Sequence, residues 1–169
     1  AALLLAQLTR LQGHTEKRQE NAEYLIDKLS KFSCLKFPKK DKRVTRRSWH
    51  LFNFRYVPAL NRNIAREKFI KAANAENLPL SGGYIHPLYK NPVFQSFAKG
   101  AKGCPVTCPY YGKKIDYTKV KNPNAEKLCF EQAVWLGHPQ LLGTKKEMDQ
   151  IVTAIAKVLE NPAELAAVK

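Results

Sequence analysis

The chain has 169 residues, of which 44% are apolar and 25% charged, the composition of an ordinary soluble globular protein. It contains no run of about 18 apolar residues, the length that a membrane-spanning helix needs. The 29 basic and 14 acidic side chains give a net charge of +15. Such a surplus favours nucleic acid, a phosphate-bearing ligand or an acidic protein surface as partner, although a solvated basic surface explains it equally well.

The first thirty residues predict one long helix that ends near Ser30. Apolar side chains recur at helical spacing, at Leu4, Leu8, Leu11, Ala22, Leu25, Ile26 and Leu29. The pattern starts without a capping residue, so we expect the helix to be cut from something upstream. Exposed leucines at positions 3, 4, 5 and 8 would make the chain prone to self-association.

A basic run from Lys36 to Arg47 comes next, with seven lysines and arginines and only Asp41 in opposition. After Phe37 it carries no aromatic residue, whereas nucleic-acid surfaces often interleave aromatic with basic side chains, which favours a solvated loop between two strands over a nucleic-acid contact. The following segment, Ser48–Val57, predicts a strand. One face carries His50, Phe52, Phe54 and Tyr56. The other face carries Trp49, Leu51, Asn53 and Arg55. Both carry bulky side chains, so we expect the strand to be central in its sheet.

Helical and extended segments alternate through the rest of the chain. Asn61 or Asn63 is expected to cap a helix that runs to about Asn77, and the order strand, helix, extended segment favours an α/β sandwich. Residues 96–123 are irregular, and a short helix and a short strand follow from Pro123 and Ala133. The clearest element is the last helix, which a Thr144–Glu147 capping box starts and Asn161-Pro162 ends.

The segment Gly82–Phe94 carries two glycines, two prolines, two tyrosines, a histidine and a lysine within thirteen residues. Glycine admits backbone conformations that other residues avoid, and proline fixes its own φ, so neither a regular helix nor a central strand fits this pattern. The segment predicts a shaped loop that presents aromatic and ionisable side chains. The alternative is a rigid connector whose tyrosines only cover the core.

Motifs for a self-contained active site are missing. The sequence has no phosphate-binding glycine loop, no H-E-x-x-H and no nucleophile elbow. Cys104 and Cys108 form a C-x3-C pair, but neither Cys34 nor Cys129 completes a second pair, which disfavours a metal site. With no export signal, we expect reduced thiols and a cytoplasmic protein. From the residues alone, we expect an accessory α+β domain with a functional loop, cut from a larger protein.

The order of several motifs resembles the C-terminal domain of the DegT/DnrJ/EryC1/StrS family of sugar aminotransferases. The matching stretches are Ala2–Leu8, Lys17–Leu25, Ser48–Phe52, Tyr84–Phe94, Cys104–Pro109, Ile115–Tyr117, Asn124–Glu126, Glu131–Leu136 and Leu141–Gly143. Two of these stretches look most like the branch of the family that aminates cyclitol ketones and related keto sugars. They are the loop Tyr84–Phe94 and the segment from Trp135-Leu136 to Leu141-Leu142-Gly143. One departure is Asn122-Pro-Asn124, where the family pattern has Cys-Pro before a small or apolar residue.

The resemblance implies a pyridoxal-phosphate (PLP) enzyme that moves an amino group from glutamine or glutamate to a keto sugar or cyclitol ketone. It implies the small α/β (α+β) domain of the aspartate-aminotransferase-like fold, a mostly antiparallel sheet packed against helices. Residues 1–30 would link to a missing large PLP domain, and residues 31–169 would form the small domain. The cofactor-bearing lysine and its partners lie in the large domain, so we assign no catalytic, cofactor-binding or metal-binding residue here and expect no catalysis from the chain alone.

What remains for this chain, by the same resemblance, is substrate capture at the mouth of an active site formed in a homodimer. The candidates are Tyr84, His86 and Tyr89, with Lys90 available for a phosphate group and with Trp49 and His50 as second choices. His86 would bond substrate hydroxyls, and the tyrosines would flank the ring. In such an enzyme, the basic charge would face an acidic large domain or a nucleotide sugar. The rival hypotheses are a stand-alone basic domain that binds nucleic acid and a purely structural module.

Overall fold

The computed structural model describes residues 2–98, 110, 112 and 116–168, which divide into two compact units. Unit 1 comprises residues 1–83 and 131–169, and unit 2 comprises residues 84–130. The cysteines of the C-x3-C pair lie outside the described residues. No described helix is both long enough and apolar enough to cross a membrane.

Unit 1 is built on a four-stranded sheet with the order β1-β2-β4-β3, in which every neighbouring pair is antiparallel. The strands are β1 (Leu35–Lys36), β2 (Leu51–Tyr56), β3 (Leu80–Ser81) and β4 (Ala133–Gly137). Phe52 lies opposite Leu136, and Phe54 lies opposite Val134. The expected small antiparallel sheet is confirmed, and β2 is central as predicted.

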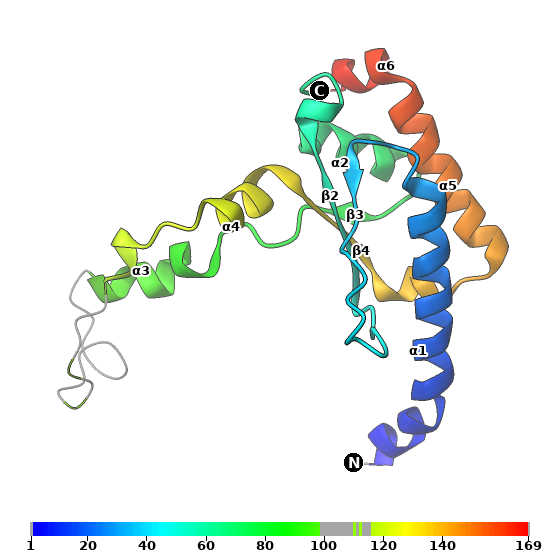
Figure 1. Cartoon of the computed structure of the whole chain (residues 1–169), viewed down its shortest axis with the longest axis horizontal. Coiled ribbons are helices and arrows are strands. Elements are labelled where there is room, and N and C mark those ends of the chain that lie inside the picture. Colours follow the sequence, from blue (N-terminus) through cyan, green and yellow to red (C-terminus); the bar gives the residue numbers. More distant parts are fainter. Residues whose placement is uncertain (1, 99–109, 111, 113–115, 169) are drawn as a thin grey trace. The chain divides into compact units, whose positions relative to one another are not determined.

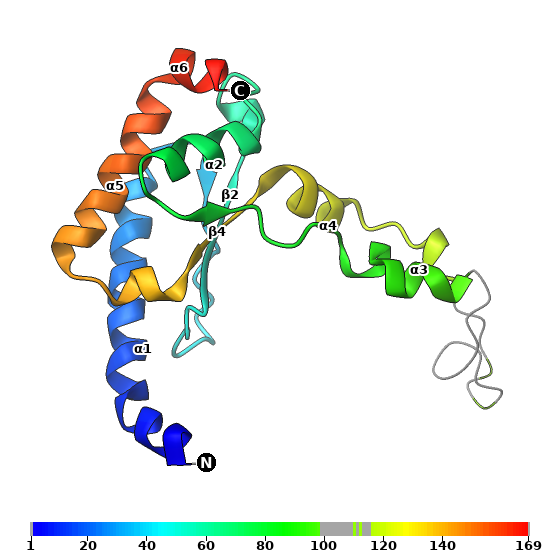
Figure 2. The same ribbon diagram turned by 180° about the vertical axis from the view of Figure 1, so that it is seen from behind.

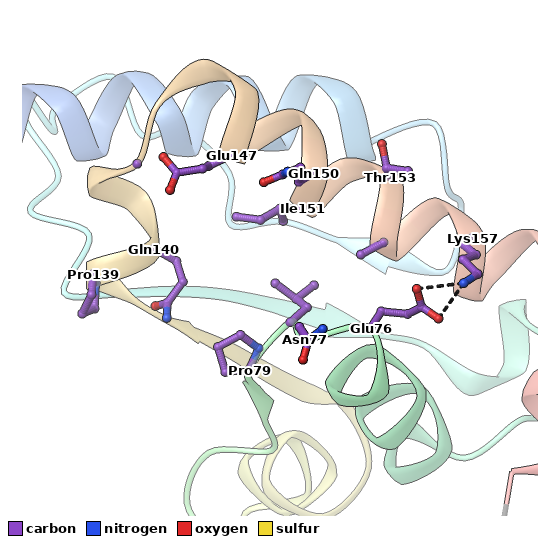
Figure 3. Close-up of a pocket in the computed structure, with 13 residues that line it drawn as sticks. Glu76, Asn77, Pro79, Pro139, Gln140, Glu147, Gln150, Ile151, Thr153 and Lys157 are labelled. Carbon is purple, nitrogen blue, oxygen red and sulfur yellow. Dashed lines mark hydrogen bonds and ion pairs between the residues drawn. The ribbon is translucent and has the colours of Figure 1, made fainter.

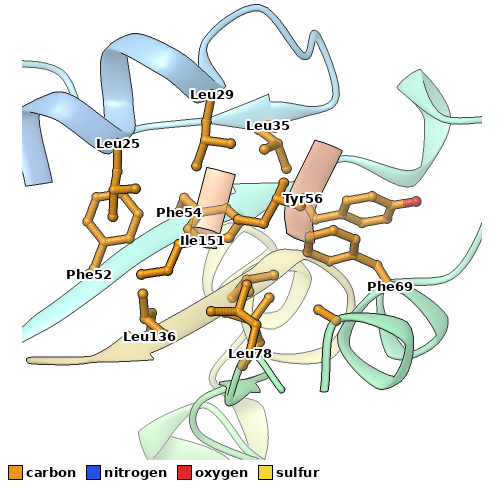
Figure 4. Close-up of a cluster of buried hydrophobic side chains, with 14 of the residues drawn as sticks. Leu25, Leu29, Leu35, Phe52, Phe54, Tyr56, Phe69, Leu78, Leu136 and Ile151 are labelled. Atoms are coloured by element: carbon orange, nitrogen blue, oxygen red, sulfur yellow. The ribbon is translucent and has the colours of Figure 1, made fainter. Parts of the chain in front are cut away.

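Two helices far apart in the sequence, α1 (Ala2–Leu29) and α5 (Lys145–Glu160), lie side by side against this sheet (Figures 1 and 2). Helix α2 (Arg66–Ala75) contacts α5, and α6 (Pro162–Ala167) contacts both. Figure 4 shows Leu25 and Leu29 of α1 pointing toward the face of β2 that carries Phe52. Alternation along β2 and β4 puts one apolar face under the helices and leaves Asn53 and Arg55 exposed on the other.

Shorter helical segments connect these elements. They are η1 (Pro58–Leu60), η2 (Leu88–Lys90), α3 (Pro92–Ala98), η3 (Tyr117–Lys119), α4 (Pro123–Lys127), η4 (Leu128–Gln132) and η5 (His138–Leu142). The predicted loop Gly82–Phe94 is therefore shorter than expected, because its last three residues begin α3. Pro92 stands at the first position of that helix, where its missing N–H leaves no hydrogen bond unmade.

The last long helix forms as its sequence predicts. Thr144 Oγ1 accepts a hydrogen bond from Glu147 N, and Thr144 N donates to Glu147 Oε2 at 2.6 Å, so both halves of the capping box are present. Asn161 ends the helix. These contacts are local in sequence, which is why the pattern alone predicts them.

Two local predictions are wrong. Neither Asn61 nor Asn63 caps α2, because the cap position is Ala65, which makes no side-chain cap bond. Asn61 instead donates its side-chain amide to Tyr56 Oη at 2.9 Å. Trp49 does not lie on the face opposite Phe52: its φ of +46° breaks the strand alternation, and its buried ring packs 5.6 Å from that of Phe52.

The basic run between β1 and β2 is largely exposed, as a solvated loop would be. Three of its cations are paired with acids: Lys40 with Glu23, Arg43 with Asp41, and Arg46 with Glu16. Across the first part of α1, Leu3, Leu4, Leu5, Leu8 and Leu11 are exposed. The expected exposure of these leucines is thus confirmed.

Candidate functional site

Unit 2 carries its own small cluster of aromatic rings. Phe94 and Phe97 of α3 pack against Tyr117 of η3, with the Phe94 and Tyr117 ring centroids 5.1 Å apart. Gln95 ties the same elements together, because its amide donates to the carbonyl oxygens of Tyr89 at 2.6 Å and Tyr117 at 3.4 Å. Side-chain contacts thus fix the backbone of the predicted loop within unit 2.

A hollow of about 410 Å³ opens beside this cluster, within unit 2. Three of the predicted site residues, His86, Tyr89 and Lys90, line it. The other lining residues are Gln95, Tyr117, Thr118, Val120 and Phe130. The volume lies within the range of about 300–1,000 Å³ that small-molecule sites occupy. The structure therefore gathers half of the predicted side chains in one concave surface.

The Tyr89 hydroxyl is held from two sides. It donates a hydrogen bond to Glu126 Oε1 and accepts one from Asn122 N at 3.1 Å. Burial, together with the bond to Glu126, raises the pKa of Tyr89, while the bond from Tyr89 lowers the pKa of Glu126. Because its hydroxyl is engaged in this way, Tyr89 mainly offers its ring to a ligand.

Lys90 and His86 complete the wall of the hollow around Phe130. The Lys90 ammonium lies 3.3 Å from Glu126 Oε2 and 5.4 Å from the centroid of the Phe130 ring. His86 meets the same ring edge-on, with 6.3 Å between centroids, and its imidazole is exposed. Pairing with Glu126 offsets the positive charge of Lys90, so the wall is polar and aromatic without a strong net charge.

The remaining predicted residues lie elsewhere. Tyr84 belongs to unit 2 and is exposed, but it does not line the hollow. Trp49 and His50 belong to unit 1. Trp49 is buried, and His50 stacks on His138 with 5.6 Å between ring centroids.

Glu126 is the residue that sequence reasoning missed. In the sequence it stands out only as the end of the stretch Asn124–Glu126, yet it binds both Tyr89 and Lys90. The Asn122-Pro123 pair that starts α4 fixes its position, since the Asn122 side chain accepts a bond from Ala125 N. The 36 residues between Tyr89 and Glu126 carry no pattern that would reveal the pairing.

The described residues do not fit PLP by themselves. The cofactor needs a lysine amine in an enclosed site with a carboxylate facing its ring. Every described lysine is at least partly exposed, and Lys90, which lines the hollow, is already paired with Glu126. The described part of the chain therefore does not supply the groups that would hold PLP. Among the described residues, no group of three histidine, cysteine or acidic side chains could hold a metal ion.

Unit 1 has a further groove of about 570 Å³ between α5, the end of α2 and η5, shown in Figure 3. None of the predicted site residues lines it. Its charged side chains are engaged within the protein: Lys157 Nζ lies 2.8 Å from Glu76 Oε1, and Glu147 belongs to the capping box. This groove therefore offers little unsatisfied polar chemistry for catalysis.

Comparisons with solved structures show the fold. The crystal structure of 3-amino-5-hydroxybenzoic acid (AHBA) synthase matches with a TM-score of 0.67 and 22% identity, over 91% of this chain and 36% of that one. An aminotransferase from Psychrobacter cryohalolentis matches with a TM-score of 0.66 and 22% identity, over 94% of this chain and 37% of that one. The expected small-domain fold is thereby confirmed.

Sequence relatives point the same way. A Streptomyces kanamyceticus protein, provisionally named as an L-glutamine:3-amino-2,3-dideoxy-scyllo-inosose aminotransferase, is 30% identical over 98% of this chain and 39% of its own length. The L-glutamine:scyllo-inosose aminotransferase of Streptomyces griseus is 28% identical over 98% of this chain and 38% of its own. The chain thus spans somewhat under two-fifths of these relatives. Residues 1–115 match the model of the DegT/DnrJ/EryC1/StrS aminotransferase family, and the chain belongs to that family.

Proposed function

We propose that this chain is the small domain of a PLP-dependent aminotransferase that transfers an amino group from glutamine or glutamate to a keto-cyclitol or keto sugar. The names of the relatives support the reaction and the substrate class. The chain matches only 39% of the first relative, and every described lysine is at least partly exposed, which supports a cofactor site carried by a separate large domain. Residues 1–30 would link to that domain, residues 31–169 would form the small domain, and the enzyme would be a cytoplasmic homodimer.

Within this enzyme, the hollow of unit 2 would contact the substrate. The observation that carries this proposal is the convergence of His86, Tyr89 and Lys90 on one concave surface. The exposed imidazole of His86 can donate or accept a hydrogen bond with a ring hydroxyl. The ring of Tyr89 offers an apolar face to the C–H side of the substrate ring, and the charge pair of Lys90 and Glu126 offers one donor and one acceptor to its hydroxyls.

Tyr84, Trp49 and His50 have weaker support as substrate contacts. Tyr84 is exposed next to His86 in the sequence and could close over a ligand. Trp49 is buried, so a substrate would reach only its edge, and His50 is already stacked on His138. We therefore place His86 and Tyr89 first.

The test joins this chain to the cofactor-bearing part of the Streptomyces kanamyceticus relative and measures transamination of a keto-cyclitol by glutamine. His86→Ala should raise KM for the keto-cyclitol about tenfold, the equivalent of one hydrogen bond of about 1.4 kcal/mol. His14→Ala, at an exposed position of α1, is the matched control and should leave KM unchanged. Equal kinetics for the His86 variant and the parent would remove His86 from the site.

The nucleic-acid hypothesis gains no support from the comparisons, which return aminotransferases. Three acids within unit 1 also offset part of the basic charge near residues 36–47. A binding assay with duplex DNA at two salt concentrations should therefore show at most weak, strongly salt-dependent association.

A further inference from the structure

Unit 1 contains a cavity that the proposed function does not use. It lies between α1 and the segment 38–49, has a volume of about 390 Å³, and is lined by Gln19, Glu23, Ile26, Asp27, Pro38, Lys40, Val44, Arg46, Arg47 and Trp49. We propose that this cavity binds a small organic molecule that carries one carboxylate on an apolar or aromatic body. Its size falls in the range of small-molecule sites.

Arg47 provides the cationic end of this site. Its guanidinium lies over the Trp49 ring, 5.5 Å from the centroid, and donates one hydrogen bond to the carbonyl oxygen of Lys39. Its backbone N–H is fixed by Gln19 Oε1 at 3.1 Å. Unlike Arg43 and Arg46, Arg47 forms no ion pair with any acid in the described part of the chain. A guanidinium has five N–H donors, so Arg47 keeps donors for a planar anion.

Two independent features of Trp49 also point to this cavity as a binding site. Its φ of +46° puts a bulky residue in the left-handed region, a strained conformation that concentrates at functional sites. The residue is 7% exposed, and its Nε1 is buried with no hydrogen-bond partner among the described residues. A buried donor without an acceptor is costly, so an acceptor supplied by a ligand would relieve that cost once the adjacent side chains shift.

The other lining residues select the ligand class. Ile26, Pro38 and Val44 give the cavity an apolar wall that suits an aliphatic or aromatic body. Glu23 and Asp27 line the same cavity; Lys40 lies 3.2 Å from Glu23, and Lys28, which does not line the cavity, lies 3.5 Å from Asp27. Three cations, Lys40, Arg46 and Arg47, line the cavity beside these two carboxylates, so its charge suits an anion. The apolar wall, which a phosphate or a nucleic acid cannot use, favours a carboxylate with an apolar body.

The test uses the 169-residue chain and follows the two indole N–H resonances by NMR, assigned with Trp49→Phe. The probes are benzoate and phenylacetate, with benzamide and inorganic phosphate as comparisons. Both carboxylates should shift the Trp49 resonance saturably, and Arg47→Gln should weaken their binding about tenfold or more. Arg43→Gln is the matched control, because Arg43 is exposed in the same loop and does not line the cavity. It should change the affinity less than twofold.

Several outcomes would overturn the proposal. These are no saturable shift with either carboxylate, equal binding of benzamide or phosphate, or equal weakening by the Arg43 and Arg47 variants. If Arg47→Gln does not fold, Arg47→Lys serves instead, since it keeps the charge and loses the planar fork. It should weaken carboxylate binding, and full retention of affinity would count against a guanidinium site.

Discussion

Asn21 offers a direct test of how α1 is fixed to the rest of unit 1. Its amide nitrogen donates to the carbonyl oxygens of Leu141 at 2.8 Å and Gly143 at 2.9 Å, and the residue is 5% exposed. Asn21→Ala removes both donors and leaves two carbonyls without that partner. Each net hydrogen bond contributes about 1 kcal/mol, and a buried acceptor left unpaired costs about 1–3 kcal/mol. The better helix propensity of alanine returns about 0.5 kcal/mol.

The expected loss in the free energy of unfolding is therefore about 2–3 kcal/mol, measured by urea denaturation followed by circular dichroism. The denaturation midpoint should fall while the m-value stays constant. Gln7→Ala is the control, because Gln7 is an exposed polar residue on the same helix, and it should change stability by less than about 0.5 kcal/mol. An Asn21 variant as stable as the control would refute the view that this bidentate contact anchors α1.

Three further predictions concern other parts of the chain. Gly83→Ala should destabilise unit 1 by about 2–4 kcal/mol in thermal unfolding, because φ is +77° and a Cβ atom would lie 2.6 Å from the Trp135 ring; an unchanged melting temperature would contradict this packing. Leu8→Glu should reduce self-association in light scattering, since Leu8 is exposed on α1. Equal association of the variant and the unchanged chain would exclude the exposed leucine face of α1 as the contact. Glu126→Gln should lower the pKa of Tyr89 in a tyrosinate absorption titration, because burial and this carboxylate both raise it. As the raised pKa favours the neutral phenol in the fold, Tyr89 stabilises unit 2 below its ordinary pKa, and that contribution is lost as pH rises through the raised value.

The parts of the fold that sequence predicts well are those fixed by neighbouring residues. The capping box of α5 joins Thr144 to Glu147 across a single turn, and the alternation in β2 is a property of any half-buried strand. The errors arise where the backbone leaves the regular regions. Arg62 and Asn63 both have positive φ, so α2 begins only at Arg66. The side chain of Asn61 therefore does not cap α2 and donates a hydrogen bond to Tyr56. No periodicity in the sequence reports such a turn.

The candidate site shows the same division between local and distant information. The family resemblance and the residue types of one short segment point to His86, Tyr89 and Lys90, and also to Tyr84, because all four lie close together in a stretch rich in glycine and proline. The partner that fixes two of them, Glu126, comes from a helix 37 residues beyond Tyr89. Its role depends on how the chain folds back, and the sequence carries no signal for that.

Charge separates the two proposed binding surfaces. In unit 2, Lys90 is paired with Glu126, so an anion that entered the hollow would have to compete with a carboxylate that is already bound. A neutral hydroxylated ring meets no such competition, because it can donate to the carboxylate and accept from the ammonium. In unit 1, the bonds from Arg43 and, less strongly, the charge of Arg47 lower the pKa of Asp41, but among the described residues Arg47 forms no ion pair, which makes that cavity the better host for an anion. Carboxylate probes should therefore shift the Trp49 resonance and leave those of His86 and Tyr89 unchanged, and His86→Ala should not alter their affinity.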